Sequence, residues 1–386
     1  MKTKSLDIIL TLALVFTVVS GFAYTWQQTT THSSAGASAM SADGRIICII
    51  NSTSHPFIST NSGGTWAIAT NSPPWGLPTP NCVAVSATGA KIFAALSTNA
   101  SQSTWMFVSS DQGLSWQKTA FPNSNFSTSY QVACSADGTN VVTSLENGPI
   151  FYSTNAGVDC YTSSIPDAGY LLACSADGRR MFAVGGASPG LYSSSNFGVN
   201  WTSQNISLPG FGSLCTSSDG NWIGLTGLNR LTIISSDGGA TWRTNAIAGQ
   251  TIDCSANGTN WIIAGNQIYT SVDAGVTWVT NFSSAQWLGG LVSADGAELA
   301  AVGSGQGIWI GRVVPSPQLN IQSQTPNVTI SWLIPSTNFV LQQTADLSNP
   351  TWTPVSTTPT LNFTNLQQQV TAPAAGSNSF FRLSAQ

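Results

Sequence analysis

The sequence predicts an all-β chain, in which a seven-bladed β-propeller closed by an N-terminal strand is followed by a small β-sandwich. An eight-residue phrase close to S-x-D/N-x-G-x-x-W occurs six times, at intervals of 36 to 50 residues. A shorter phrase, S-A-D-G or a near variant, occurs seven times and alternates with the first. Self-similarity at about 40 to 45 residues, with several short strands in each repeat, is typical of propeller blades.

Both phrases have the chemistry of tight turns. Glycine adopts positive φ at little cost, and an Asp or Asn side chain hydrogen-bonds to the nearby backbone. We call the eight-residue phrase the long turn, and its copies start at Ser59, Ser109, Ser153, Ser194, Ser235 and Ser271. The S-A-D-G turns start at Ser41, Ser86, Ser135, Ser175, Ser217, Ser255 and Ser293.

One repeat, residues 128–166, shows how a blade is built. Strands are predicted over 129–134, 139–144, 150–153 and 161–164, with a turn between each pair. Four short strands separated by frequent turn signals form an antiparallel meander. In such a meander the first and third turns share one face, which we call the S-A-D-G face. The second turns and the blade connections form the opposite face, which we call the loop face.

The numbers of the two turns predict how the propeller closes. There are seven S-A-D-G turns but only six long turns, and the last repeat, residues 288–312, lacks a fourth strand. Residues 24–28, YTWQQ, resemble the Trp-Gln-Lys that begins at Trp116 after another long turn. We therefore expect the N-terminal strand to complete the last blade, which removes the free edges of an open sheet.

The N-terminus has the features of a secretory signal peptide over residues 1–23. Two lysines precede an apolar run over residues 8–19, and Gly21 and Ala23 provide small residues before Tyr24. The run is shorter than the roughly 20 residues that span a membrane, so we expect no stable membrane span after cleavage. An uncleaved anchor is the alternative. The expected location is secreted, either extracellular or periplasmic.

The composition limits the possible partners. Charged residues make up 7% of the 386-residue chain, and the net charge is −4, so a basic groove for nucleic acid is not expected. Cys134, Cys174 and Cys254 each precede an S-A-D/N-G turn, where other repeats carry Val, Met or Thr. This pattern indicates core packing. No CxxC or His pairing accompanies the cysteines, and we expect no metal and no cofactor.

The long turn resembles the Asp-box, also called the BNR repeat, of sialidases and other propellers, over about residues 24–313. The resemblance implies that Ser and Asp cap a turn between strands three and four, and that Trp packs between blades. The third copy ends in Cys160 instead of Trp, so a local weak point is expected there. The structural residues of three complete copies are Asp111, Gly113, Trp116, Asp237, Gly239, Trp242, Asp273, Gly275 and Trp278.

The predicted second domain, residues 314–386, starts within a proline-containing linker over residues 313–317, and residues 318–386 contain no long turn. Six strand-like runs there predict a small β-sandwich. The segment 339–355, followed by the FFRL of residues 380–383, resembles a C-terminal Ig-like module of secreted bacterial proteins. Such modules are spacers or adhesion units by that resemblance, and no chemistry is assigned to this one.

The resemblance to Asp-box propellers implies a binding or active site on the loop face. A sialidase binds its substrate carboxylate with three arginines, but Arg230 is the only arginine that we expect on that face. A conventional sialidase is therefore not expected. Other glycoside hydrolases need two carboxylates, and the candidates are Glu146, Asp167 and Asp253. Asp253 lies in a predicted inner strand, where burial would raise its pKa, although an acid bonded to neighbouring amides or water is the simpler interpretation.

Aromatic residues are the stronger feature of the loop face. Trp75, Trp105, Tyr170 and Trp287, together with Arg230, are the candidate ligand-binding residues. The leading hypothesis is a monomeric, non-catalytic secreted propeller that binds a glycan or an extracellular protein on this face. A glycoside hydrolase is one alternative. An assembly factor, by resemblance to the Asp-box propellers that assist photosystem assembly, is the other, although the basic patch of that family is absent.

Overall fold

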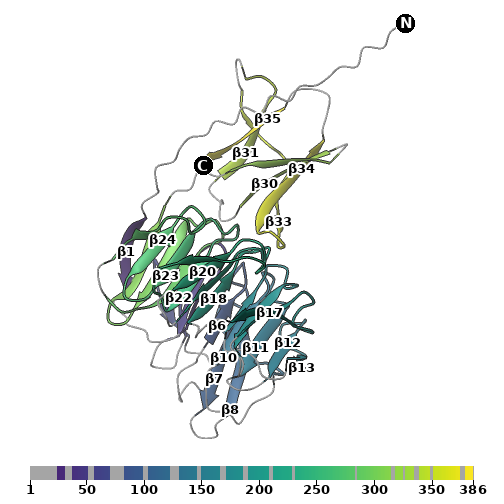
Figure 1. Cartoon of the computed structure of the whole chain (residues 1–386). Helices are drawn as coiled ribbons and strands as arrows, with labels where there is room; N and C mark the ends of the chain where they lie inside the picture. The colour runs from purple at the N-terminus through teal and green to yellow at the C-terminus, as the bar shows by residue number, and fades with distance from the viewer. Residues whose placement is uncertain are drawn as a thin grey trace.

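The computed structural model is an all-β chain (Figure 1). It describes residues 24–30, 37–50, 56–69, 82–98, 103–121, 130–145, 149–165, 171–185, 190–207, 212–227, 231–282, 285–313, 318–324, 327–333, 339–347, 351–373 and 379–385. Within these ranges, no helix has the length and apolar character needed to cross a membrane.

The described residues up to Val313 form seven four-stranded antiparallel sheets, the blades of the propeller. Blade 1 has β2 (Ser38–Met40), β3 (Ile47–Ile50), β4 (Pro56–Ser59) and β5 (Ala67–Ile68). Blade 2 has β6 (Cys82–Val85), β7 (Ile92–Thr98), β8 (Ser103–Ser109) and β9 (Gln117–Lys118). Blade 3 has β10 (Tyr130–Cys134), β11 (Val141–Leu145), β12 (Ile150–Ser153) and β13 (Tyr161–Thr162). Blade 4 has β14 (Leu171–Cys174), β15 (Met181–Gly185), β16 (Gly190–Ser194) and β17 (Thr202–Ser207).

The remaining three blades follow the same order. Blade 5 has β18 (Ser213–Thr216), β19 (Ile223–Thr226), β20 (Thr232–Ser235) and β21 (Arg243–Asn245). Blade 6 has β22 (Thr251–Cys254), β23 (Trp261–Ala264), β24 (Ile268–Ser271) and β25 (Val279–Thr280). Blade 7 has β26 (Trp287–Val292), β27 (Glu298–Gly303), β28 (Gly307–Arg312) and β1 (Thr25–Thr30). The predicted closure is therefore confirmed, because β1 is the outer strand of the last blade and pairs antiparallel with β28.

The first strand of each blade lines a central channel, and these seven inner strands contact one another in a closed ring. A ring of backbone hydrogen bonds joins the S-A-D-G turns at one end of this channel. The second residue of each turn donates its N–H to the carbonyl of the same residue in the next blade, at 2.7 to 2.9 Å. We call this the alanine ring, and its members are Ala42, Ala87, Ala136, Ala176, Ser218, Ala256 and Ala294.

The glycine of each S-A-D-G turn is required by both conformation and space. Gly89 has φ +71°, and a Cβ there would lie 2.1 Å from Cγ1 of Ile46 in the preceding blade. The same relation recurs around the ring, because the residue just before the second strand, or at its start in blade 7, packs on the next blade's turn. The other pairs are Lys91 with Gly138, Asn140 with Gly178, Arg180 with Gly220, Trp222 with Gly258, Asn260 with Gly296 and Glu298 with Gly44.

The long turns cap the passage from the third to the fourth strand. In the second copy, Ser109 Oγ accepts the Gly113 N–H at 2.7 Å, and Asp111 accepts the Ser115 N–H at 2.8 Å. The indole of Trp116 donates to the Gly113 carbonyl at 3.2 Å. The equivalent indole bonds are made by Trp242 to Gly239 at 3.0 Å and by Trp278 to Gly275 at 3.1 Å.

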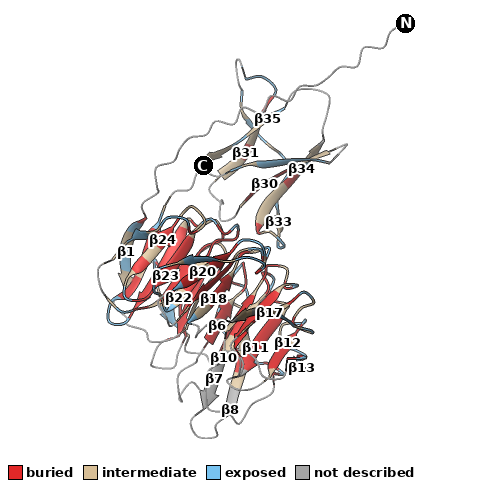
Figure 2. Ribbon diagram, in the orientation of Figure 1, coloured by how far each residue is buried: buried red, intermediate tan, exposed pale blue. Residues whose placement is uncertain are grey.

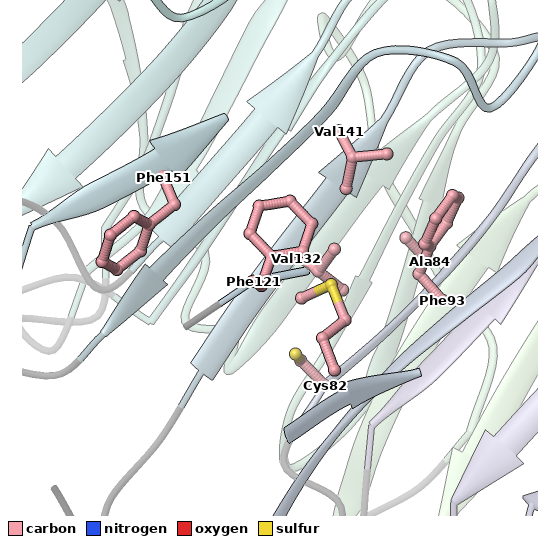
Figure 3. Close-up of a cluster of buried hydrophobic side chains, with 8 residues drawn as sticks. Cys82, Ala84, Phe93, Phe121, Val132, Val141 and Phe151 are labelled. Carbon is pink, nitrogen blue, oxygen red and sulfur yellow. The ribbon is translucent and has the colours of Figure 1, made fainter. Parts of the chain in front are cut away.

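The copy that ends in Cys160 keeps its capping bonds but has no tryptophan. The buried ring of Phe121 lies beside this turn, 3.4 Å from the position that a Cβ on Gly157 would occupy. Phe121 belongs to the apolar cluster between blades 2 and 3, where its ring points among Val132, Val141 and Phe151 (Figure 3). An aromatic residue from the preceding blade thus fills part of the gap.

The propeller core lies between the blades, and buried residues concentrate in the propeller strands (Figure 2). The residues after the linker form two smaller sheets, which we call the C-terminal unit. One sheet has β29 (Asn320–Gln324), β30 (Asn327–Leu333), β34 (Gln367–Pro373) and β33 (Thr360–Asn362). The other has β32 (Thr353–Pro354), β31 (Phe339–Thr344) and β35 (Phe380–Ala385). Their shared core is Ile330, Trp332, Leu341 and Val370.

Candidate functional site

The central channel of the propeller contains a cavity. It encloses about 410 Å³ and is lined by inner strands from all seven blades. Most lining side chains are small or apolar. The polar groups are few, and they are contributed by Ser38, Gln131, Ser213, Thr251 and Asp253. Such a cavity offers hydroxyl, amide and apolar contacts but very little charge.

Asp253 is the only acidic side chain among the described residues that line this cavity. It stands in β22, as predicted, where burial raises its pKa to about 7. One carboxylate oxygen accepts the Cys254 N–H at 2.9 Å, and the other accepts the Val292 N–H of blade 7 at 2.9 Å. The carboxyl group therefore joins blade 6 to blade 7, and this agrees with the simpler interpretation of an acid bonded to amides.

Two of the predicted aromatic residues lie in the described part of the chain. Trp105, in β8, is half-buried, and the Lys118 ammonium lies over its ring, 2.9 Å from the centroid. One face of the Trp105 ring is thus occupied by a cation–π contact. Trp287 is 2% exposed and packs against Phe282 with ring centroids 4.8 Å apart. The expectation that Trp287 meets a ligand is corrected by this burial, since its ring is part of the core between blades 6 and 7.

The other predicted site residues lie outside the described residues. They are Trp75, Glu146, Asp167, Tyr170 and Arg230.

A second group of buried acids escaped the sequence reasoning. Burial raises the pKa of Glu298 to about 7, although Arg312 contacts it at 3.0 Å, and burial raises the pKa of Asp295 to about 6. Arg312 also donates to the Ser62 carbonyl of blade 1. Arg312 thus joins blade 7 to blade 1 at the S-A-D-G face, whereas Asp295 accepts hydrogen bonds from Ser293 and Ala297 of its own turn. The sequence signal of the two acids was position alone, with Asp295 inside an S-A-D-G turn and Glu298 close to the same turn.

These three acids predict how stability depends on pH. Asp253, Asp295 and Glu298 all have folded-state pKa values above their unfolded values, so their protonation favours the folded state. The stabilisation is complete below the unfolded pKa values and is lost as pH rises through the folded ones, at about 6 to 7. Asp237, in the fifth long turn, titrates below this window, since hydrogen bonds from Thr241 lower its pKa to about 2.

We therefore expect residues 24–386 to melt several degrees higher at about pH 5.5 than at about pH 8. Scanning calorimetry at the two pH values measures the difference. Asp253→Asn should reduce the difference, because the titrating group is removed. A melting temperature that stays level or falls on acidification over this range would contradict the assignment.

No protein-family model matches the chain, and no curated protein matches its sequence. Solved structures match its fold. YCF48 bound to D1 peptide is 13% identical, with a TM-score of 0.57, covering 77% of this chain and 99% of that chain. YCF48 from Cyanidioschyzon merolae is 13% identical, with a TM-score of 0.54, and the match covers 74% of this chain and 98% of that chain.

A GH74 xyloglucanase from Xanthomonas campestris is 11% identical, with a TM-score of 0.60. The match covers 81% of this chain but only 60% of that enzyme. At such identities the likeness shows a shared all-β propeller fold, and any activity or partner has to be argued from the residues of this chain.

Proposed function

We propose that this chain is a secreted, non-catalytic recognition protein that binds an extended segment of a protein partner at the loop-face mouth of its channel. The observation that carries the proposal is the lining of the 410 Å³ cavity, which has amide, hydroxyl and apolar groups but a single described acid. Recognition sites are typically concave and largely apolar, with a few polar groups that fix orientation.

The residues argue for binding without catalysis. Glycoside hydrolysis requires two carboxyl groups on either side of the scissile bond. Only Asp253 is available among the described lining residues, and both of its oxygens hold backbone N–H groups. Because both oxygens already bond to the backbone of two blades, Asp253 is poorly placed to donate a proton to a substrate. Glycan hydrolysis, which the likeness to a xyloglucanase would suggest, is therefore the second choice.

The chemistry of the channel also favours a particular kind of partner. The chain carries a net charge of −4, so long-range attraction favours a neutral or basic segment. At the loop-face ends of inner strands, Gln131 and Ser213 offer hydrogen-bonding groups to a peptide backbone. The fold is able to accept such a ligand, since the YCF48 neighbour is described with a bound D1 peptide.

A displayed library of random linear peptides tests the proposal. We expect selection on immobilised residues 24–386 to enrich sequences with neutral or basic character, and the purified peptides to bind in solution. The same preparation is incubated with xyloglucan and assayed for reducing sugar. Release of sugar that Asp253→Asn abolishes, or the absence of any peptide enriched over an uncoated surface, would overturn the proposal.

A further inference from the structure

The alanine ring at the S-A-D-G end of the channel is occupied by a side chain from the C-terminal unit. Leu366 is 8% exposed and forms one apolar cluster with Ala87, Ala136, Ala176 and Ala256 of the ring. Figure 1 shows β33 and β34 reaching from the C-terminal unit toward the propeller, and Leu366 belongs to the turn that joins them. Leu333 and Leu361 pack against the same cluster and widen the contact.

The backbone at Leu366 indicates that this contact is specific. Leu366 has φ +56°, in the left-handed region that glycine or asparagine adopts more easily. Asn365 supports the turn, since its side-chain oxygen accepts the Gln367 N–H at 3.2 Å. The left-handed backbone is unfavourable for leucine unless another interaction compensates for the strain. Here the compensation is the burial of the apolar side chain on the axis of the propeller.

The composition of the ring supports the same conclusion. An exposed β-turn accepts most residue types at its second position, yet six of the seven ring positions are alanine. The exception is Ser218, whose hydroxyl donates to the Ala256 carbonyl at 2.9 Å. Small side chains around the axis leave room for one apolar group and present no charge to it.

A second cavity lies next to Leu366, adjacent to the cavity of the main channel. It encloses about 160 Å³ and is lined by ring residues together with Leu366 itself. It shares Met40, Val85, Cys134 and Cys174 with the larger cavity, so these four residues separate two successive cavities along the propeller axis.

We propose that the alanine ring is a docking socket for the C-terminal unit, and that Leu366 is the stopper that closes this end of the channel. The unit is then more than a spacer. It makes the channel a blind pocket, which ligands enter only from the loop face, and it joins the two parts of the chain through one apolar side chain.

Cysteines in the channel provide a direct test. Cys254 lines the cavity beside Leu366, while Cys215, its neighbour in blade 5, lines only the larger cavity. Cys48 is fully buried and lines neither. All three are free thiols, so labelling by a small thiol reagent such as methyl methanethiosulfonate, followed by peptide mapping, reports access to each place separately.

Leu366→Gly removes the stopper and suits the left-handed backbone, so the turn should survive. In the full chain we expect this change to accelerate labelling of Cys254 by about tenfold, with Cys215 and Cys48 nearly unchanged. Leu347→Gly, at an exposed leucine of the same unit, is the matched control and should have no effect. Unchanged labelling of Cys254 in Leu366→Gly, or an equal rise at Cys48 that signals unfolding, would overturn the proposal.

Discussion

Removal of residues 24–30 is expected to lower the melting temperature of the propeller by about 10 °C or more. The deletion takes away β1, which forms the outer strand of blade 7. It also removes the buried Tyr24, whose hydroxyl donates to the Gly296 carbonyl at 2.8 Å, and Trp26, which packs on Phe282 at 5.2 Å between ring centroids. Loss of such aromatic anchors costs about 3 to 5 kcal/mol.

Scanning calorimetry of residues 31–386 beside residues 24–386 measures this effect. A synthetic peptide of residues 24–30 provides the control, because binding of the missing strand should restore part of the lost stability. Closure by β1 would be refuted if the shortened chain melted within about 2 °C of the intact one.

Gly89→Ala is expected to destabilise the chain by about 3 kcal/mol. Alanine is strained at φ +71°, and its Cβ would lie 2.1 Å from Cγ1 of Ile46. Gly305→Ala is a matched control, since Gly305 has φ +72° but no atom within 4 Å of a Cβ. Gly305→Ala should lower the free energy of unfolding only by the strain of alanine at positive φ, about 1 kcal/mol.

Urea denaturation of both variants separates the two contributions. The difference between them measures the packing of one blade on the turn of the next. Equal losses of unfolding free energy in the two variants would show that blade-to-blade contact at this glycine contributes nothing.

The fold could be predicted because its signals are local. Each turn carries its own Gly, Asp and Ser, and the missing fourth strand of the last repeat pointed to the N-terminal segment that β1 provides. The contacts that complete the fold are not local. Phe121 beside Gly157 and Leu366 in the alanine ring join segments that only the folded chain brings together.

The candidate site was less predictable for the same reason. Asp253 could be placed in an inner strand because the other repeats carry apolar residues or alanine there, and the structure agrees. Trp287 was expected near a ligand because it stands where a connection meets a strand. The register of β26 instead turns its ring into the core, against Phe282. Successive side chains of a strand point to opposite faces of the sheet, so the face of each residue cannot be predicted while the register of the strand is unknown.

The most direct test of the central claim is the affinity of a library-selected peptide for two size-matched variants. Ser213→Trp narrows the channel near its loop-face mouth, whereas Thr280→Trp adds the same ring to the exposed outer strand of blade 6. Isothermal titration calorimetry should show binding weakened by about tenfold or more in Ser213→Trp and unchanged in Thr280→Trp. Equal affinity of the two variants would place the peptide elsewhere and contradict recognition at the channel mouth.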